Sequence, residues 1–183
     1  MAEKLHRDNI ICEEEKDIIE YGLDCMVSNL IGISVTVIIG FVFGNFWGAI
    51  VLCFMIFPLR KYAGGFHADT KGKCFLLSTG LLCLSCWLFF KLSWTSFGYG
   101  IIICTFGGVI WKLSPVENTN KRLDEVEYQF YKRKSRMILV TESLLFLVSF
   151  LLQWTGIQRI VAMSVFIVGT VAVAGKVKMR LRH

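Results

Sequence analysis

Six apolar runs separated by charged loops restrict this chain more than any other feature of its sequence. A helix needs about 20 apolar residues to cross roughly 30 Å of hydrocarbon, and several runs approach that length. Hydrophobic residues make up 55% of the chain, with only 2 prolines, which exceeds the apolar share of a soluble domain. We therefore expect an all-α polytopic membrane protein with about six transmembrane helices. The runs cover residues 26–44, 46–59, 74–90, 97–111, 137–154 and 157–175.

The positions of the basic residues predict how these helices cross. Cytoplasmic loops of membrane proteins retain Lys and Arg, whereas translocated loops are poor in them. With six crossings and both termini inside, only Lys91 and Arg159 of the 20 basic residues fall outside. The second run is the weakest, because its uninterrupted part, residues 46–57, would extend only about 18 Å as a helix and could be re-entrant or interfacial. If it failed to cross, the basic loop 60–73 would lie outside, so we expect it to span.

The N-terminal segment, residues 1–22, is charged and interrupted, so no cleavable signal peptide is expected. Within residues 9–20, apolar side chains recur at helical spacing while acidic residues face elsewhere, which predicts an amphipathic helix. Its polar face is acidic, unlike the basic face that favours anionic lipid, so protein or substrate is the expected neighbour. We expect one membrane domain over residues 1–183, in which a cytoplasmic amphipathic segment precedes the six-span region 26–175 and a basic cytoplasmic tail, 176–183, follows it.

Seven cysteines are scattered mostly through the apolar runs, and an odd number so placed is a poor disulfide framework. Reduced thiols are the better interpretation. Cys83 and Cys86 form a Cys-x-x-Cys pattern, but no second pair or nearby histidine completes a zinc site, so we predict no metal and no cofactor. The aromatic residues lie mostly within or beside the runs, where lipid-facing packing explains them better than nucleic-acid stacking does. No nucleic-acid partner is predicted.

The loop from Arg60 to Cys74, Arg-Lys-Tyr-Ala-Gly-Gly-Phe-His-Ala-Asp-Thr-Lys-Gly-Lys-Cys, carries the candidate chemistry. Cys74 opens an apolar run, and the exposed N–H groups at a helix N-terminus favour thiolate over thiol. Lys71 and Lys73 add positive charge to the same place. His67 could then act as the general base and later protonate the leaving amine. On spacing alone, an incidental histidine remains the alternative.

The two candidate groups need a bend in the chain to meet. Seven residues on one straight helix are separated by about 10.5 Å along its axis, which is too far for a hydrogen bond between His67 and Cys74. Gly64, Gly65 and Gly72 make an unbroken helix costly and permit the backbone conformations of a bend. Asp69 could orient the imidazole, although an aspartate two residues from a histidine is common by chance.

At these residues the sequence resembles the accessory gene regulator B (AgrB) peptidases, in which an arginine, a glycine pair, a histidine and a cysteine occur in this order. Arg60, Gly64-Gly65-Phe66-His67-Ala68 and Cys74 match that signature. The loop 114–123, which contains Asn120 and Lys121, is similar to the family's Pro…Asn-Lys-Pro-Leu segment, with Arg122 at the second proline. Tyr21-Gly22-Leu23 is also similar to the family's N-terminal region, so the matches extend over residues 21–123.

The resemblance implies a cysteine endopeptidase of the bacterial cell membrane with its active site on the cytoplasmic side. Such an enzyme removes the C-terminal tail of an AgrD-like quorum-sensing propeptide through a thioester on Cys74, with His67 as the base, and promotes closure of a thiolactone or lactone ring. The propeptide has an amphipathic helix, which the lipid bilayer would concentrate, and an acidic tail, for which Arg60 is suited because a guanidinium binds carboxylates bidentately. A homodimer is also implied.

Glu142 is an ionisable residue inside the fifth run, where such side chains are costly and often functional. It could line the active cleft, pair helices or reach the cytoplasmic interface. A small membrane transporter or peptide-export component without proteolytic activity is the main rival function, and a non-catalytic scaffold is a second. We predict Cys74 and His67 as catalytic residues. Supporting or substrate-binding roles are predicted for Arg60, Gly64, Gly65, Asp69, Lys71, Asn120, Lys121 and Glu142.

Overall fold

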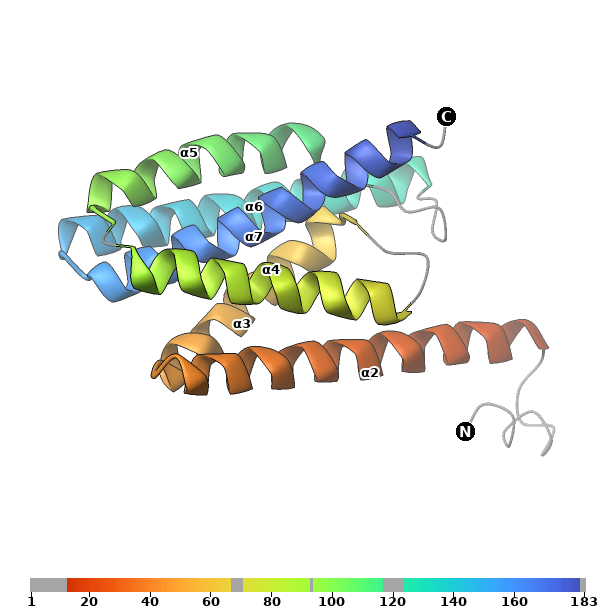
Figure 1. Ribbon diagram of the computed structural model, residues 1–183. Coiled ribbons are helices and arrows are strands. Elements are labelled where there is room, and N and C mark those ends of the chain that lie inside the picture. Colours follow the sequence, from red (N-terminus) through yellow and green to blue (C-terminus); the bar gives the residue numbers. More distant parts are fainter. Residues whose placement is uncertain (1–12, 67–70, 93, 117–123, 182–183) are drawn as a thin grey trace. The chain divides into compact units, whose positions relative to one another are not determined.

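The fold of the chain is given by a computed structural model that describes residues 13–66, 71–92, 94–116 and 124–181 (Figure 1). Within these ranges the side chains of residues 13–25, 28, 29, 71 and 74 are outside the description. The regular structure of the described residues is helical, apart from one isolated bridge between Gly64 and Val116. The helices are α2 (Glu13–Val42), α3 (Phe46–Ala63), α4 (Lys71–Lys91), α5 (Ser96–Leu113), α6 (Glu125–Leu151) and α7 (Thr155–Leu181).

Each of the six expected apolar runs coincides with one of these helices, so the predicted all-α membrane fold is confirmed. Among the described residues, α3, α5 and α7 are long and apolar enough to cross a membrane, while Leu30–Val42 and Phe75–Lys91 are shorter apolar stretches of α2 and α4. The weak second run gains length because α3 continues through Arg60 and Lys61 to Ala63. Its 18 residues extend about 27 Å, close to the thickness of the hydrocarbon.

The chain divides into two compact units, residues 1–35 and 36–183. In the first unit, α2 begins at Glu13 and is continuous with the first apolar run. It therefore includes the expected amphipathic segment from that residue onward, whereas residues 9–12 of the segment lie outside the described part. In the second unit, α2 ends at Val42 and Asn45 caps the next helix by accepting a hydrogen bond from the Gly48 N–H at 3.0 Å.

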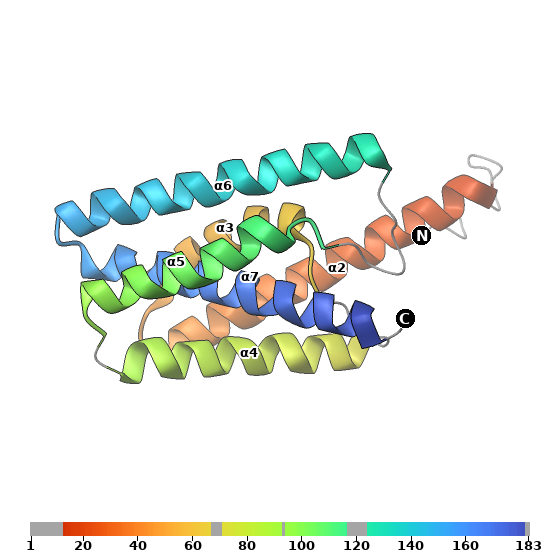
Figure 2. The same ribbon diagram turned by 90° about the horizontal axis from the view of Figure 1, so that it is seen from above.

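Helix α7 is the central helix of the second unit. It packs against α3, α4, α5 and α6, and Figures 1 and 2 show it running between α4 and α5. Small residues permit these close contacts: a Cβ placed on Gly169 would lie 2.8 Å from the Phe106 ring. The core that α7 forms with α3, α5 and α6 extends to the last residue of α3 and so lies directly beneath the candidate loop. Its buried members are Leu59, Ala63, Ile110, Leu139, Val165 and Val168.

One face of α6 carries three buried polar residues at intervals of seven, Ser135, Glu142 and Ser149. Residues seven apart share a helix face, and each of the three is tied to a different group. In a membrane, hydrogen bonds between helices of this kind replace the hydrophobic driving force that is absent between apolar surfaces. The contacts are Ser114 Oγ to Ser135 Oγ at 2.6 Å, Ser164 Oγ to Glu142 Oε1 at 3.5 Å, and Gln158 Nε2 to the Ser149 carbonyl at 3.0 Å.

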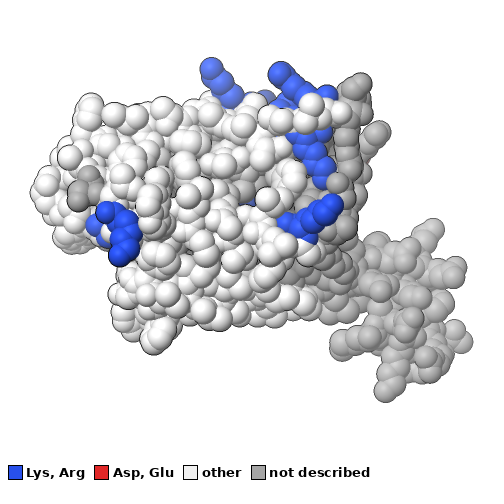
Figure 3. Space-filling model, viewed as in Figure 1, with Lys and Arg blue, Asp and Glu red and all other residues white. Residues whose placement is uncertain are grey.

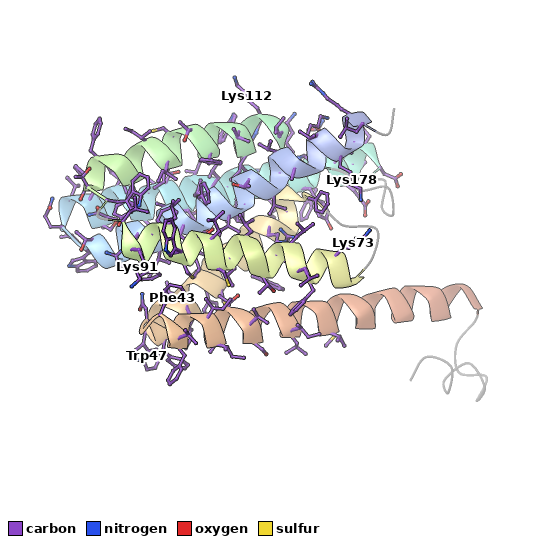
Figure 4. The ribbon with its side chains drawn as sticks, in the orientation of Figure 1. Phe43, Trp47, Lys73, Lys91, Lys112 and Lys178 are labelled. Carbon is purple, nitrogen blue, oxygen red and sulfur yellow. The ribbon has the colours of Figure 1, made fainter. Side chains whose placement is uncertain are left out.

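Charge is distributed unequally between the two ends of the second unit. Lys112 and Lys178 lie at the end where α5 and α7 finish, and Lys73 lies where α4 begins, whereas Lys91 lies at the opposite end, where α4 finishes (Figure 4). On the face of the molecule drawn in Figure 3, most of the basic side chains gather at the end where α5 and α7 finish and α4 begins. We call this end the basic end. By the positive-inside rule it is the end expected in the cytoplasm, and the orientation stays a prediction.

The hydrogen bond of Glu142 gives a first testable prediction. Replacing Glu142 by Ala leaves Ser164 without this partner and is expected to lower the free energy of unfolding by about 1–2 kcal/mol, whereas Glu142→Gln keeps an acceptor and is expected to cost less. Thr141→Ala is the matched control, because Thr141 is exposed and bonds only within its own helix, to the Met137 carbonyl. Unfolding in mixed detergent micelles, followed by circular dichroism, measures all three. Equal losses for Gln and Ala would contradict the hydrogen-bond explanation.

A second prediction concerns orientation. The test uses a variant in which all native cysteines are replaced by serine. In this variant, Lys91→Cys is expected to react with a membrane-impermeant maleimide added to intact cells, whereas Lys112→Cys is expected to react only after the cells are opened. Both lysines are exposed at helix ends, so accessibility to water is matched and only the side of the membrane differs. Labelling of Lys112→Cys from outside would reverse the proposed topology.

Candidate active site

A glycine turn follows α3 and begins the candidate loop. Gly64 has φ 70° and ψ −152°, and Gly65 has φ 135°, conformations that side chains with a Cβ rarely adopt. The turn starts as the Gly64 N–H donates to the Arg60 carbonyl at 3.1 Å. The bend expected from the glycine pair is thus present. Gly72, the third glycine of the loop, does not take part in this bend: it lies within α4 in helical conformation, where a Cβ would meet nothing within 4 Å.

The turn brings together the two loops that carry the sequence motifs. The Val116 N–H donates to the Ala63 carbonyl at 2.9 Å, and Gly64 forms a parallel bridge with Val116. A Cβ on Gly64 would collide with the Val116 carbonyl oxygen, so glycine is required here for space as well as for its φ. Val116 precedes the segment with Asn120 and Lys121, which itself lies outside the described residues.

On its other side the glycine turn rests against α7. The Phe66 N–H donates to the Val171 carbonyl at 3.0 Å, and the Lys178 Nζ lies 5.1 Å from the centre of the Phe66 ring. A Cβ on Gly65 would lie 2.7 Å from the Val171 Cγ1. Residues 64–66 are therefore held between the 114–116 segment and α7, and the next residue in the chain is His67.

The two predicted catalytic residues are described to different extents. His67 lies outside the described residues, as does Asp69. The backbones of Lys71 and Cys74 are described, and Cys74 is the fourth residue of α4 as the structure gives it. The first four N–H groups of a helix have no carbonyl partner within it and carry partial positive charge. Lys73 adjoins Cys74 and is exposed, so positive charge borders this position.

Arg60 and Lys61 occupy the last turn of α3 at the basic end. Arg60 is half-buried and Lys61 is exposed. The next residue of α3 belongs to an aromatic cluster that sequence reasoning missed, in which Tyr62 packs edge-on against Phe130 and Tyr131 of α6 with ring centres 6.3 Å and 5.5 Å apart. The cluster joins the end of α3 to the polar first half of α6, beside the turn.

Glu142 is 4% exposed and lies between α6 and α7, where it accepts the bond from Ser164. It is one heptad, or about 10.5 Å, further into the bundle than Ser135, whose hydroxyl contacts Ser114 at the end of α5. Of the three alternatives for this residue, helix pairing is the one that its contacts support. Sequence reasoning did not single out Val171, Gly175 or Lys178, because valine and glycine are common in apolar helices that pack closely and lysine is common at their ends.

The glycine turn generates a third prediction, tested with one alanine substitution in the turn and one in α4. Gly64→Ala forces a Cβ into an unfavourable conformation and against the Val116 carbonyl, and is expected to lower the free energy of unfolding by about 1–3 kcal/mol or more. Gly72→Ala is its control, since this position is helical and open, and it is expected to be neutral or slightly stabilising. Thermal unfolding in detergent measures both. A cost for Gly72→Ala equal to that of Gly64→Ala would contradict the distinction.

Comparison with known proteins places the chain beside one family. The family model for accessory gene regulator B matches residues 1–173. An AgrB-like protein 2 from Clostridium perfringens (strain 13 / Type A) is 32% identical over 145 residues, which cover 75% of this chain and 65% of that protein. An AgrB-like protein from strain SM101 / Type A is also 32% identical over 145 residues, covering 63% of its length. The chain thus spans just under two thirds of these relatives. No solved structure matches.

Proposed function

The chain belongs to the accessory gene regulator B (AgrB) family, and from this premise we propose that it is a membrane cysteine endopeptidase that processes an AgrD-like quorum-sensing propeptide. Cys74 is the nucleophile and His67 the general base. One observation supports this pairing above the others: residues 64–66 are held between two other segments immediately before His67, while Cys74 lies at the start of α4. The proposed chemistry needs a base whose backbone is held in place and a cysteine whose thiolate is favoured by a helix N-terminus.

The reaction proceeds in two steps. The Cys74 thiolate attacks the carbonyl carbon of the scissile peptide bond, and His67 passes the thiol's proton to the nitrogen of the departing tail, leaving a thioester on Cys74. A thiol or hydroxyl within the same propeptide then attacks the thioester, gives up its proton, and frees the cysteine as the ring closes. Because this second nucleophile belongs to the same molecule, its high effective concentration favours ring closure over hydrolysis.

The basic end supplies the charge that an acidic propeptide tail requires. Arg60 is proposed to bind a tail carboxylate, because its carbonyl accepts the Gly64 N–H at the start of the glycine turn and its guanidinium can bind bidentately. Lys71 would favour the thiolate, Asp69 would orient the imidazole, and Asn120 and Lys121 would border the site from the second loop. Other described cations at this end are Lys61, Lys73, Lys112, Lys132, Arg133, Lys134, Arg136, Lys176, Lys178 and Arg180.

The proposed cellular setting follows the same reasoning. The protein resides in the bacterial cell membrane with both termini and the active site in the cytoplasm, where the membrane itself concentrates an amphipathic substrate. A homodimer is part of the proposal. Many large apolar side chains of the second unit are exposed, among them Phe54, Leu76 and Trp87, and lipid or a second subunit would cover them.

The fourth prediction tests the peptidase itself. Co-expression with the propeptide and mass spectrometry are expected to detect the cyclised product with the wild-type chain, and Cys74→Ser or His67→Ala is expected to lower its formation on the order of 10³-fold or more. Cys104→Ser is the control, because Cys104 is an exposed free cysteine on α5. A mass adduct on the Cys74 peptide would identify the thioester. Normal processing by both active-site variants would refute the peptidase and leave a transport or scaffold role.

A further inference from the structure

A single face of α7 supports the segment that leads into His67. Val171, Gly175 and Lys178 are spaced i, i+4 and i+7, so they lie along one side of the helix. All three contact Gly65 or Phe66: Val171 through its carbonyl, Lys178 through its Nζ over the ring, and Gly175 through its backbone. We call Val171, Gly175 and Lys178 the α7 seat.

Gly175 is the member of the seat that has no room for any side chain. A Cβ placed on it would lie 2.8 Å from the Gly65 carbonyl carbon and 2.8 Å from the Phe66 nitrogen. Real Cβ atoms do not approach other atoms so closely, and because both neighbours are backbone atoms they cannot swing aside as a flexible side chain would. Gly175 is buried, although residues 173 and 174 beside it are exposed. Alanine here would push residues 65 and 66 away from α7.

Gly175 also makes the hydrogen bond of Phe66 possible. In an α-helix the Val171 carbonyl accepts the N–H of residue 175, and its second lone pair is available to another donor. The Phe66 N–H uses it at 3.0 Å. Because Gly175 has no side chain beside that carbonyl, a second backbone segment can approach it. Displacing Phe66 would cost this bond and leave its N–H without the Val171 carbonyl.

The two segments that carry the proposed catalytic residues both pack against α7. The segment 64–66 sits on α7 immediately before His67, and α4, which carries Cys74, also packs against α7. Only residues 67–70 connect the two. A shift of the segment on its seat therefore changes the direction in which the chain enters His67 while leaving α4 in place.

We propose that Gly175 is a positioning residue for the peptidase, which acts through Phe66 to orient His67 towards Cys74. This inference rests on the proposed function. Gly175 touches neither substrate nor the reacting atoms; its part is to hold the backbone beside the histidine close to α7. The α7 seat thus positions the base, His67, and the start of α4 positions the nucleophile, Cys74.

The fifth prediction compares Gly175→Ala with Gly156→Ala. Both place the same methyl group on α7, but a Cβ on Gly156 meets nothing within 4 Å. In purified protein with synthetic propeptide, Gly175→Ala is expected to lower kcat about tenfold to a hundredfold with KM nearly unchanged, because a displacement near 1 Å at the base has effects of this size. Gly156→Ala is expected to match the wild type. Wild-type kcat in Gly175→Ala would overturn the proposal.

Two further measurements separate positioning from a loss of fold. In the His67→Ala background, Gly175→Ala is expected to have little additional effect on kcat, since a residue that acts through an absent base cannot contribute. Hydrogen exchange of the Phe66 amide is expected to become faster in Gly175→Ala, while the protection of α5 stays that of the wild type. A full additional loss in the double variant would show that Gly175 acts elsewhere and would overturn the proposal.

The alkylation rate of Cys74 distinguishes a failure of this inference from a failure of the proposed function. It needs no propeptide: with iodoacetamide at neutral pH, both His67→Ala and Gly175→Ala are expected to slow the reaction severalfold, because a nearby imidazole favours the thiolate. If Cys74→Ser still processes the propeptide, the peptidase is refuted whatever Gly175 does. If Cys74→Ser is inactive but Gly175→Ala alkylates and exchanges as the wild type does, only the seat is refuted.

Discussion

The close packing of α7 against four other helices is the constraint on which the rest of the second unit depends. Lipid is as apolar as the helix surfaces, so burial alone does little to bring such helices together in a membrane. Contact area between backbones and hydrogen bonds between helices must do so instead. Gly169 and Gly175 let α5 and the glycine turn come close, and the buried polar residues Glu142 and Ser149 tie α6 to the same helix.

This arrangement places a rigid support at one end of a bundle whose other surfaces are covered with exposed apolar side chains. The core around Ala63 and Ile110 reaches the last turn of α3, and the turn that follows is held on one side by Val116 and on the other by Val171. The same end carries most of the described cations (Figure 3). A precisely held backbone beside a positive field is suited to binding an acidic peptide and to activating a thiol.

Much of the fold could be predicted because lipid imposes a simple rule on sequence: a spanning helix must be apolar along its whole length. The six runs were therefore visible, and the structure differs mainly at their ends. Helix α6 begins at Glu125, well before its apolar run, because its polar residues continue the helix into water at no cost. Gly72 was counted with Gly64 and Gly65 among the residues that permit a bend, and it is helical, since a glycine permits a bend without requiring one. His67 and Cys74 came from their motif, and their mutual geometry stays a prediction.

The sequence by itself determined the class of fold, the positions of the helices, the family and the two residues proposed to react, because hydropathy, charge and a short motif are local properties of the chain. Only the tertiary structure decided which segments touch. That Gly65 faces Gly175, that Ala63 bonds Val116, and that Glu142 meets Ser164 follow from how helices distant in sequence pack together. A small or polar residue in an apolar helix signals that some close contact exists, but its partner is fixed only when the helices are assembled.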